Sequence, residues 1–232
     1  MQLFYTPEII TNQELPKEEA KHCIRVLRLG EGSEINLTDG KGNFHKAIIE
    51  QAHPKHCLVS IIETIPQPSL WPFYLHIAVA PTKNMDRMEW FAEKATEIGI
   101  DAITFLNCRY SERREIKTER IEKILISAMK QSLKATLPSL NGMTDFKSFV
   151  KQSFEGKKFI AHCEPGEKRL LKQACLPGEQ ALILIGPEGD FSSEEIELAQ
   201  KEGFIPISLG ESRLRTETAA LTACQTVHFI NQ

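Results

Sequence analysis

Two glycine-containing turns near the end of the chain carry the residues best placed to bind a ligand. Gly186-Pro187-Glu188-Gly189 follows the apolar run 182–185, and Gly210 follows a second apolar run, 205–209. Such runs are typical of short buried strands, and glycine and proline end them sharply. Because ligands of open α/β sheets bind beyond the carboxyl ends of the strands, the turns predict a site built largely from backbone. The alternative is an ordinary αβ unit whose glycines serve only the turns.

The loop after the second turn adds two cations and a carboxylate, Arg213, Arg215 and Glu217. Fixed cations can stabilise negative charge that develops during a reaction, and a positioned carboxylate can accept a proton. Neither turn has the phosphate-loop spacing GxxxxGK[ST] or the dinucleotide spacing GxGxxG. A standard nucleotide or dinucleotide site is therefore not supported.

The elements that must position this site alternate along the chain after a proline-rich stretch, 66–72. Ser192 and Glu195 form a capping-box pattern that predicts the start of a helix, and Gly203 is a plausible stop. We expect strands near 74–80, 102–106, 158–163, 181–185 and 205–209, and helices near 86–98, 118–133, 192–202 and 216–229. This alternation favours a mainly parallel sheet covered on both faces.

The segment before the prolines has a different pattern. Alternating strands are expected at 34–39, 43–51 and 56–63, with one short helix at about 17–27. This predicts a small β-barrel-like domain. We therefore divide the chain into residues 1–68 and residues 73–232, with the prolines between them as a linker.

The motifs together resemble the RsmE family, bacterial 16S ribosomal RNA uridine-N3 methyltransferases of the SPOUT class. The resemblance rests on Ile185 to Gly189 with Phe191, on Leu209-Gly210, and on the run Leu214 to Ala219. It continues upstream in four further segments: Lys83 with 86–89, 94–99, Gln131-Ser132, and His22 with 26–29. These motifs occur in order over nearly the whole chain.

The resemblance implies a PUA-like barrel that binds RNA, followed by a SPOUT-type α/β domain with a deep trefoil knot. It also implies a homodimer with each cofactor site near the subunit interface. The implied cofactor is S-adenosylmethionine, held by backbone groups in an apolar slot. The residues expected to contact it are Glu164, Ile185, Gly186, Gly189, Leu209, Gly210 and Leu214. No metal is needed. His162, at the end of the preceding strand, is expected to be a hydrogen-bonded structural residue.

Methylation at N3 of uracil requires that the base be unpaired and its imide proton removed. Negative charge then spreads onto the neighbouring carbonyl oxygens. We expect Arg215 to stabilise that charge, with Arg213 and Arg28 as alternatives. Glu217 either positions Arg215 or accepts the proton. The alternative for Arg215 and Glu217 is a structural pair that holds the loop.

Local basic patches, and not the net charge of −3, must provide the RNA contacts. Residues 109–134 contain eight Lys and Arg against four Glu. Together with the first domain, this segment could clamp one RNA, although a charged face is often only solvated. The predicted RNA-binding residues are His22, Arg25, Arg28, Lys83, Arg87, Arg113, Arg114 and Gln131.

Asp190 departs from the family pattern, because a second glycine is expected after Gly189. A carboxylate there could tighten the turn or repel an anionic ligand. It motivates the alternative function, a catalytically silent RNA-binding factor of ribosome assembly. The preferred function is methylation of a specific uridine in the 16S rRNA of the small (30S) ribosomal subunit.

The composition sets broad bounds. The chain has 232 residues, 41% of them hydrophobic and 25% charged, which predicts a folded core. Its six cysteines are scattered without zinc spacing, so we expect reduced thiols. The sequence has neither a signal-peptide pattern nor an apolar run long enough to span a membrane. We expect a cytoplasmic protein without a membrane partner.

Overall fold

The structure is a computed structural model that describes residues 2–232. The chain forms two compact units. The first contains the residues up to Leu70 together with 126–137, and the second contains 71–125 and 138–232. The second half of one helix, α3 (Thr118–Gln131), thus belongs to the first unit.

The first unit contains a four-stranded sheet in the order β1-β2-β3-β4. Its strands are Leu3–Tyr5, Glu34–Thr38, Asn43–Gln51 and Leu58–Pro66. β2, β3 and β4 pair antiparallel, as their alternating patterns predicted, whereas β1 pairs parallel to β2. β1 was not predicted, because three residues are too few to show a periodicity. Helix α1 (Lys17–Lys21) continues into one π-helical turn, His22–Val26.

The second unit contains a seven-stranded sheet in the order β7-β6-β5-β10-β8-β11-β9, and all its paired strands are parallel. The strands are β5 Leu75–Val79, β6 Ala102–Asn107, β7 Ser139–Asp145, β8 Lys157–Ala161, β9 Arg169–Leu170, β10 Ala181–Ile185 and β11 Ile205–Ser208. β10 is buried along its whole length. This explains its continuous apolar sequence.

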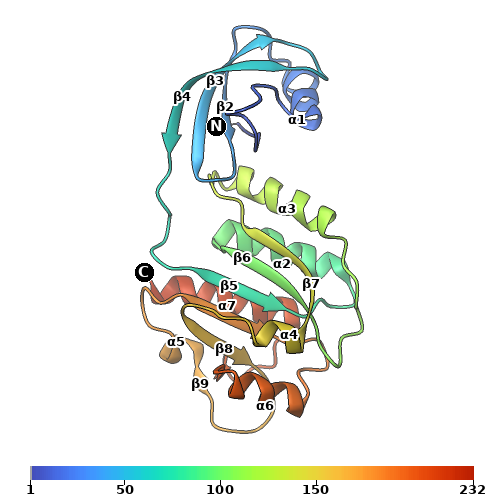
Figure 1. Cartoon of the computed structure of the whole chain (residues 1–232), viewed down its shortest axis with the longest axis vertical. Helices are drawn as coiled ribbons and strands as arrows, with labels where there is room; N and C mark the ends of the chain where they lie inside the picture. The colour runs from blue at the N-terminus through green and yellow to red at the C-terminus, as the bar shows by residue number, and fades with distance from the viewer. Residues whose placement is uncertain (1) are drawn as a thin grey trace. The chain divides into compact units, whose positions relative to one another are not determined.

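Helices cover both faces of this sheet (Figure 1). α2 (Met85–Ile98) packs against α7 (Thr216–Ile230), which contacts β5 and β10. α4 (Phe146–Val150) packs against α6 (Ser193–Lys201) over the other face. A short helix, α5 (Leu171–Ala174), contacts β9, β11 and α7. Phe146, Phe191 and Phe204 lie in the core beneath α4 and α6.

The predicted fold class is confirmed: a mainly parallel α/β unit accompanied by a small mixed-sheet unit. The capping box at Ser192 and Glu195 is present at the start of α6. The prediction missed β7, α4, β9 and α5. β7 has the polar sequence SLNGMTD and is largely exposed, since it lies at the sheet edge. The implied trefoil knot stays a prediction. Within residues 2–232, none of the helices combines the length and apolar character needed to cross a bilayer.

Candidate functional site

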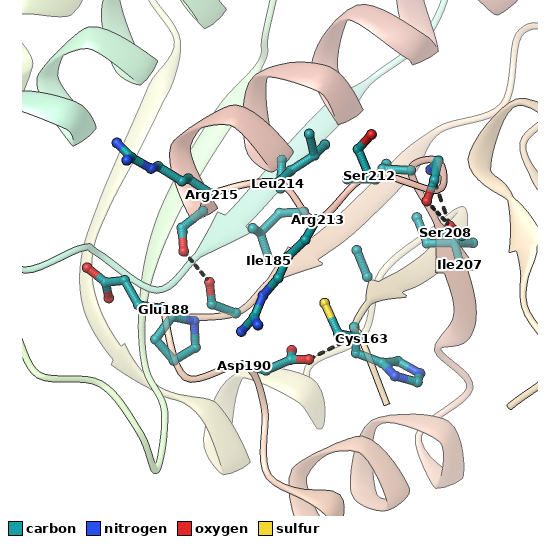
Figure 2. A pocket seen from close by; sticks show the side chains of 18 residues that line it. Cys163, Ile185, Glu188, Asp190, Ile207, Ser208, Ser212, Arg213, Leu214 and Arg215 are labelled. Carbon is teal, nitrogen blue, oxygen red and sulfur yellow. Dashed lines mark hydrogen bonds between the residues drawn. The ribbon is translucent and has the colours of Figure 1, made fainter. Parts of the chain in front are cut away.

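Three neighbouring strands end together at one edge of the large sheet. Ile185 of β10 pairs with Ala161 of β8, and Ala161 pairs with Ile207 of β11. The loops that follow these three residues therefore begin side by side. They enclose a cavity of about 320 Å³ (Figure 2). This volume lies within the range of small-molecule sites.

Most of the predicted cofactor residues line this cavity: Ile185, Gly186, Leu209, Gly210 and Leu214. Gly189 and Glu164 do not. They line an adjacent cavity of about 510 Å³, which shares Cys163, Asp190 and Arg213 with the first. Five of the predicted cofactor residues thus line this cavity and two line the adjacent one, and cofactor contact by all seven stays a prediction.

The turn after β10 is held in shape by Asp190. Its backbone is in the left-handed region, with φ of 64°, a conformation that Asp tolerates better than most residues because its side chain bonds locally. The Asp190 carboxylate accepts hydrogen bonds from the backbone N–H of Phe191 at 2.8 Å and of Cys163 at 2.7 Å. Asp190 therefore ties the β10 turn to the loop after β8, which is the tightening that the sequence offered as one alternative.

The loop between β11 and α7 is anchored by Thr216, a residue the sequence analysis did not select. Its buried hydroxyl donates a 3.0 Å hydrogen bond to the carbonyl oxygen of Gly186. This bond joins the turn after β10 to the start of α7, where the loop that begins at Gly210 ends. Arg215 precedes α7 as its N-cap residue, and its side chain is exposed, as is that of Arg213. Within the described chain, neither guanidinium has a hydrogen-bond or ion-pair partner.

Glu217 is buried, with 7% of its surface exposed. Its Oε1 lies 3.7 Å from the Arg87 guanidinium, and its Oε2 has no hydrogen-bond partner among the described residues. No described contact links Glu217 to Arg215. The structure thus places Glu217 beside α2 and leaves one carboxylate oxygen unengaged.

His162, at the end of β8, was expected to be hydrogen-bonded. That expectation is wrong, since neither ring nitrogen has a partner among the described residues. Burial lowers the pKa of the imidazole, and the charge of Lys168 lowers it further. A neutral His162 therefore lies against the cavity with free donor and acceptor capacity.

The predicted RNA-binding residues of the second unit have different roles. The Arg113 guanidinium donates to the carbonyl oxygens of Thr82 and Lys83, at 3.3 and 2.6 Å. The Lys83 side chain pairs with Glu112 at 3.1 Å. Glu188 accepts a 2.9 Å hydrogen bond from the backbone N–H of Lys83, which fixes this loop to the β10 turn. Arg113 and Lys83 thus have internal partners, as Arg87 does.

Arg114 differs from its neighbour Arg113. It is exposed and has no partner among the described residues. It lines a third cavity, near the N-terminus of α6, together with Arg109 and Lys147. Arg109 pairs with Glu194 at 3.0 Å.

In the first unit, His22 is half-buried in edge contact with Phe4. Arg25 and Arg28 are exposed, and Arg28 has a left-handed backbone with φ of 56°. Gln131, at the end of α3, is also exposed and belongs to this unit. These four residues are therefore found within one unit.

Two family models match the chain. The RNA methyltransferase domain matches residues 69–228, and the RNA methyltransferase PUA domain matches residues 15–62. The chain belongs to the RNA methyltransferase family. The first of these models covers the complete cavity described above.

Similar proteins agree with this assignment. Ribosomal RNA small subunit methyltransferase E of Rickettsia conorii (strain ATCC VR-613 / Malish 7) is 30% identical, over 94% of this chain and 89% of that protein. A probable rRNA-methyltransferase from Porphyromonas gingivalis has a TM-score of 0.95 and 45% identity, covering 100% of this chain and 98% of the other. Ribosomal RNA small subunit methyltransferase E from Neisseria gonorrhoeae, solved bound to S-adenosyl methionine, has a TM-score of 0.84 and 26% identity, with coverages of 100% and 98%.

Proposed function

We propose that this protein transfers a methyl group from S-adenosylmethionine to N3 of a uridine in 16S rRNA of the small ribosomal subunit. The observation that carries the proposal is the cavity at the carboxyl ends of β8, β10 and β11, in a chain of this family. The name of the Rickettsia relative and the ligand of the Neisseria structure support the substrate and the methyl donor.

The cavity suits such a donor. Ile185, Leu209 and Leu214 offer apolar walls for the adenosine and for the carbon atoms around the sulfur, and the turns at Gly186 and Gly210 bring backbone close to the ligand. A Cβ at Gly210 would meet no atom within 4 Å, so the glycine leaves open space there. When bound, S-adenosylmethionine supplies an electrophilic methyl group and leaves as S-adenosylhomocysteine.

The chain itself must prepare the uracil. We assign to Arg215 the stabilisation of the negative charge on the uracil carbonyl oxygens, because it lies in the loop that lines the cavity and its exposed guanidinium is unpaired among the described residues. We assign to the free Oε2 of Glu217 the acceptance of the N3 proton. Loss of the N3 proton and formation of the new N–CH₃ bond together leave the uracil without a net charge.

RNA binding is proposed for Arg25, Arg28, Gln131 and Arg114, whose side chains are exposed. We also propose that residues 1–68 form a PUA-like RNA-binding domain and residues 73–232 the methyltransferase domain. A homodimer, a trefoil knot and a cytoplasmic location complete the proposal, because family resemblance and a ribosomal substrate favour them.

The catalytically silent alternative rested on Asp190, and its basis is now weaker. The carboxylate is held in place by two backbone hydrogen bonds, and the cavity beside it remains open to a ligand. A partly assembled or complete subunit is the proposed substrate.

The test is a methylation assay with purified protein, labelled S-adenosylmethionine and small subunits that lack the modification. Nuclease digestion and mass spectrometry should reveal N3-methyluridine, and naked 16S rRNA should react more slowly. No label in rRNA, from a folded protein that binds S-adenosylhomocysteine, would refute the proposed reaction.

A further inference from the structure

Two opposite charges border the cavity proposed for the methyl donor, and the roles assigned above to Arg215 and Glu217 leave both of them unused. Asp190 belongs to the turn after β10, and Arg213 belongs to the loop after β11. Both residues line this cavity and also the adjacent cavity of about 510 Å³. Figure 2 shows the Arg213 side chain reaching across the cavity in the direction of Asp190.

Both charges act on one neighbour, the Cys163 thiol. Burial raises the pKa of this thiol, Asp190 raises it further, and Arg213 opposes that effect. Within residues 2–232, however, no ion pair or hydrogen bond joins Arg213 to Asp190. A space between opposed charges remains.

Both groups also have unused hydrogen-bonding capacity. The Asp190 carboxylate accepts two backbone N–H bonds and also interacts with the Cys163 thiol, which leaves about one of the four acceptor positions of a carboxylate. Those two bonds fix the carboxylate to two loops, so its position is set before a ligand arrives. Arg213 offers all of its N–H donors, since the described residues give it no partner.

We propose that Asp190 and Arg213 form a receptor for an α-amino-acid zwitterion, the methionine end of the methyl donor. Asp190 receives the α-ammonium group, and Arg213 receives the α-carboxylate. This rests on the proposed function, and it makes Arg213 a donor-binding residue in place of a second cation for the uracil. Asp190, which stands where the family pattern has glycine, would thus contribute directly to binding of the methyl donor.

Glu164 is the rival carboxylate for the ammonium group. It lines the adjacent cavity but not the cavity at the strand ends. It is also exposed, and no hydrogen bond orients its carboxylate among the described residues. Asp190 is the better-positioned acceptor, because binding is tighter where the receptor is pre-organised.

The experiment compares the affinities of three probes by calorimetric titration. S-adenosylhomocysteine has the complete zwitterion, decarboxylated S-adenosylhomocysteine has only the ammonium group, and 5′-methylthioadenosine has neither. The variants are Asp190→Asn, Asp190→Gly and Arg213→Gln. Glu164→Gln is the matched carboxylate control, and Arg215→Gln removes the same charge from the same loop.

The wild-type protein should bind S-adenosylhomocysteine about 100-fold more tightly than 5′-methylthioadenosine, as expected for two charged hydrogen-bonded contacts of about tenfold each. Arg213→Gln should weaken S-adenosylhomocysteine about tenfold without weakening the decarboxylated probe. Both Asp190 variants should weaken S-adenosylhomocysteine and the decarboxylated probe about tenfold, relative to 5′-methylthioadenosine. The two control variants should keep the wild-type ratios.

Equal affinities of the wild-type protein for S-adenosylhomocysteine and 5′-methylthioadenosine would overturn the receptor and leave the methyltransferase proposal standing. A larger loss in Glu164→Gln than in Asp190→Asn would also overturn it. Absence of binding by every probe would count against the proposed function itself. Because each comparison is a ratio of affinities within one variant, the unfolded fraction of a partly unstable variant cancels from it.

Discussion

Two groups of cations border the same edge of the large sheet, and they differ in what holds them. In the loop after β11, Arg213 and Arg215 extend without partners among the described residues. In the loops after β5 and β6, Lys83 pairs with Glu112, and Arg113 is hydrogen-bonded to two backbone carbonyls. The first group is available to ligands, whereas the second group is held by partners within the protein.

This difference shows why a count of charges overstates the capacity for RNA. Residues 109–134 carry an excess of cations in the sequence. In the structure, Arg109 pairs with Glu194, Arg120 with Glu89, and Lys130 with Glu19. The exposed Arg109–Glu194 pair contributes little to stability, whereas Glu89, Lys130 and Glu19 are largely buried. All three pairs neutralise charge that a phosphate would need, which leaves Arg114 and Lys117 as unpaired cations of this loop among the described residues.

Gly210→Val should have the largest effect, because it displaces the loop that carries the unpaired cations. Gly210 has φ of 136°, which a β-branched residue cannot adopt without strain, even though a Cβ would have open space. We expect loss of detectable S-adenosylhomocysteine binding and of turnover.

Gly178→Val is the matched control, with φ of 77° and equally open space in a turn that does not line the donor cavity. Thermal unfolding should show a comparable loss of stability for both variants, about 1–3 kcal/mol. If Gly178→Val also abolished binding, the effect of Gly210→Val would be one of general instability.

Arg215→Ala should reduce turnover about 100- to 1,000-fold, which is typical of removing one charge-stabilising group from an active site. Its affinity for S-adenosylhomocysteine should stay within about threefold, because the proposed partner of Arg215 is the uracil. Single-turnover rates on unmodified subunits measure the first quantity, and calorimetry measures the second. An unchanged rate would show that Arg215 belongs with the structural cations of the other group.

Those parts of the cavity that are formed by backbone turns could be predicted from the sequence. The glycine turns, the capping box and the buried strands follow from local chemistry, and the residues selected from them, Ile185, Gly186, Leu209, Gly210 and Leu214, all line one cavity. Contacts between distant loops could not be predicted. The bond from Thr216 to Gly186 and the bond from Cys163 to Asp190 depend on which strands are neighbours.

The same limit applies to charge. The number of cations in a segment can be read from the sequence, but the sequence does not show that Glu217 faces Arg87 and not Arg215. It also does not show that α3 is shared between two units, because a continuous amphipathic helix carries no mark of that division. Short exposed elements such as β7 were missed for lack of an apolar pattern.

Glu217→Gln tests a buried carboxylate, which belongs to neither group of cations. We expect turnover to fall about 100-fold through loss of the proton acceptor, while S-adenosylhomocysteine affinity stays near the wild-type value. Arg87→Gln is the control for the structural alternative, because it removes the partner at 3.7 Å and leaves the carboxylate. Equal losses of turnover and of thermal stability in both variants would assign Glu217 to loop structure instead of proton transfer.

Arg113→Ala and Arg114→Ala give the smallest effects and the sharpest contrast, because the two residues are adjacent and chemically identical. Arg113→Ala should lower the free energy of unfolding by about 1–2 kcal/mol, since two backbone carbonyls lose a charged donor. Arg114→Ala should leave stability within about 0.5 kcal/mol, and it should reduce the salt slope of RNA binding by about one unit. Urea unfolding and RNA titrations at several salt concentrations measure the two quantities. If Arg113→Ala weakened RNA binding as much as Arg114→Ala at unchanged stability, internal partners would not be what separates the two groups of cations.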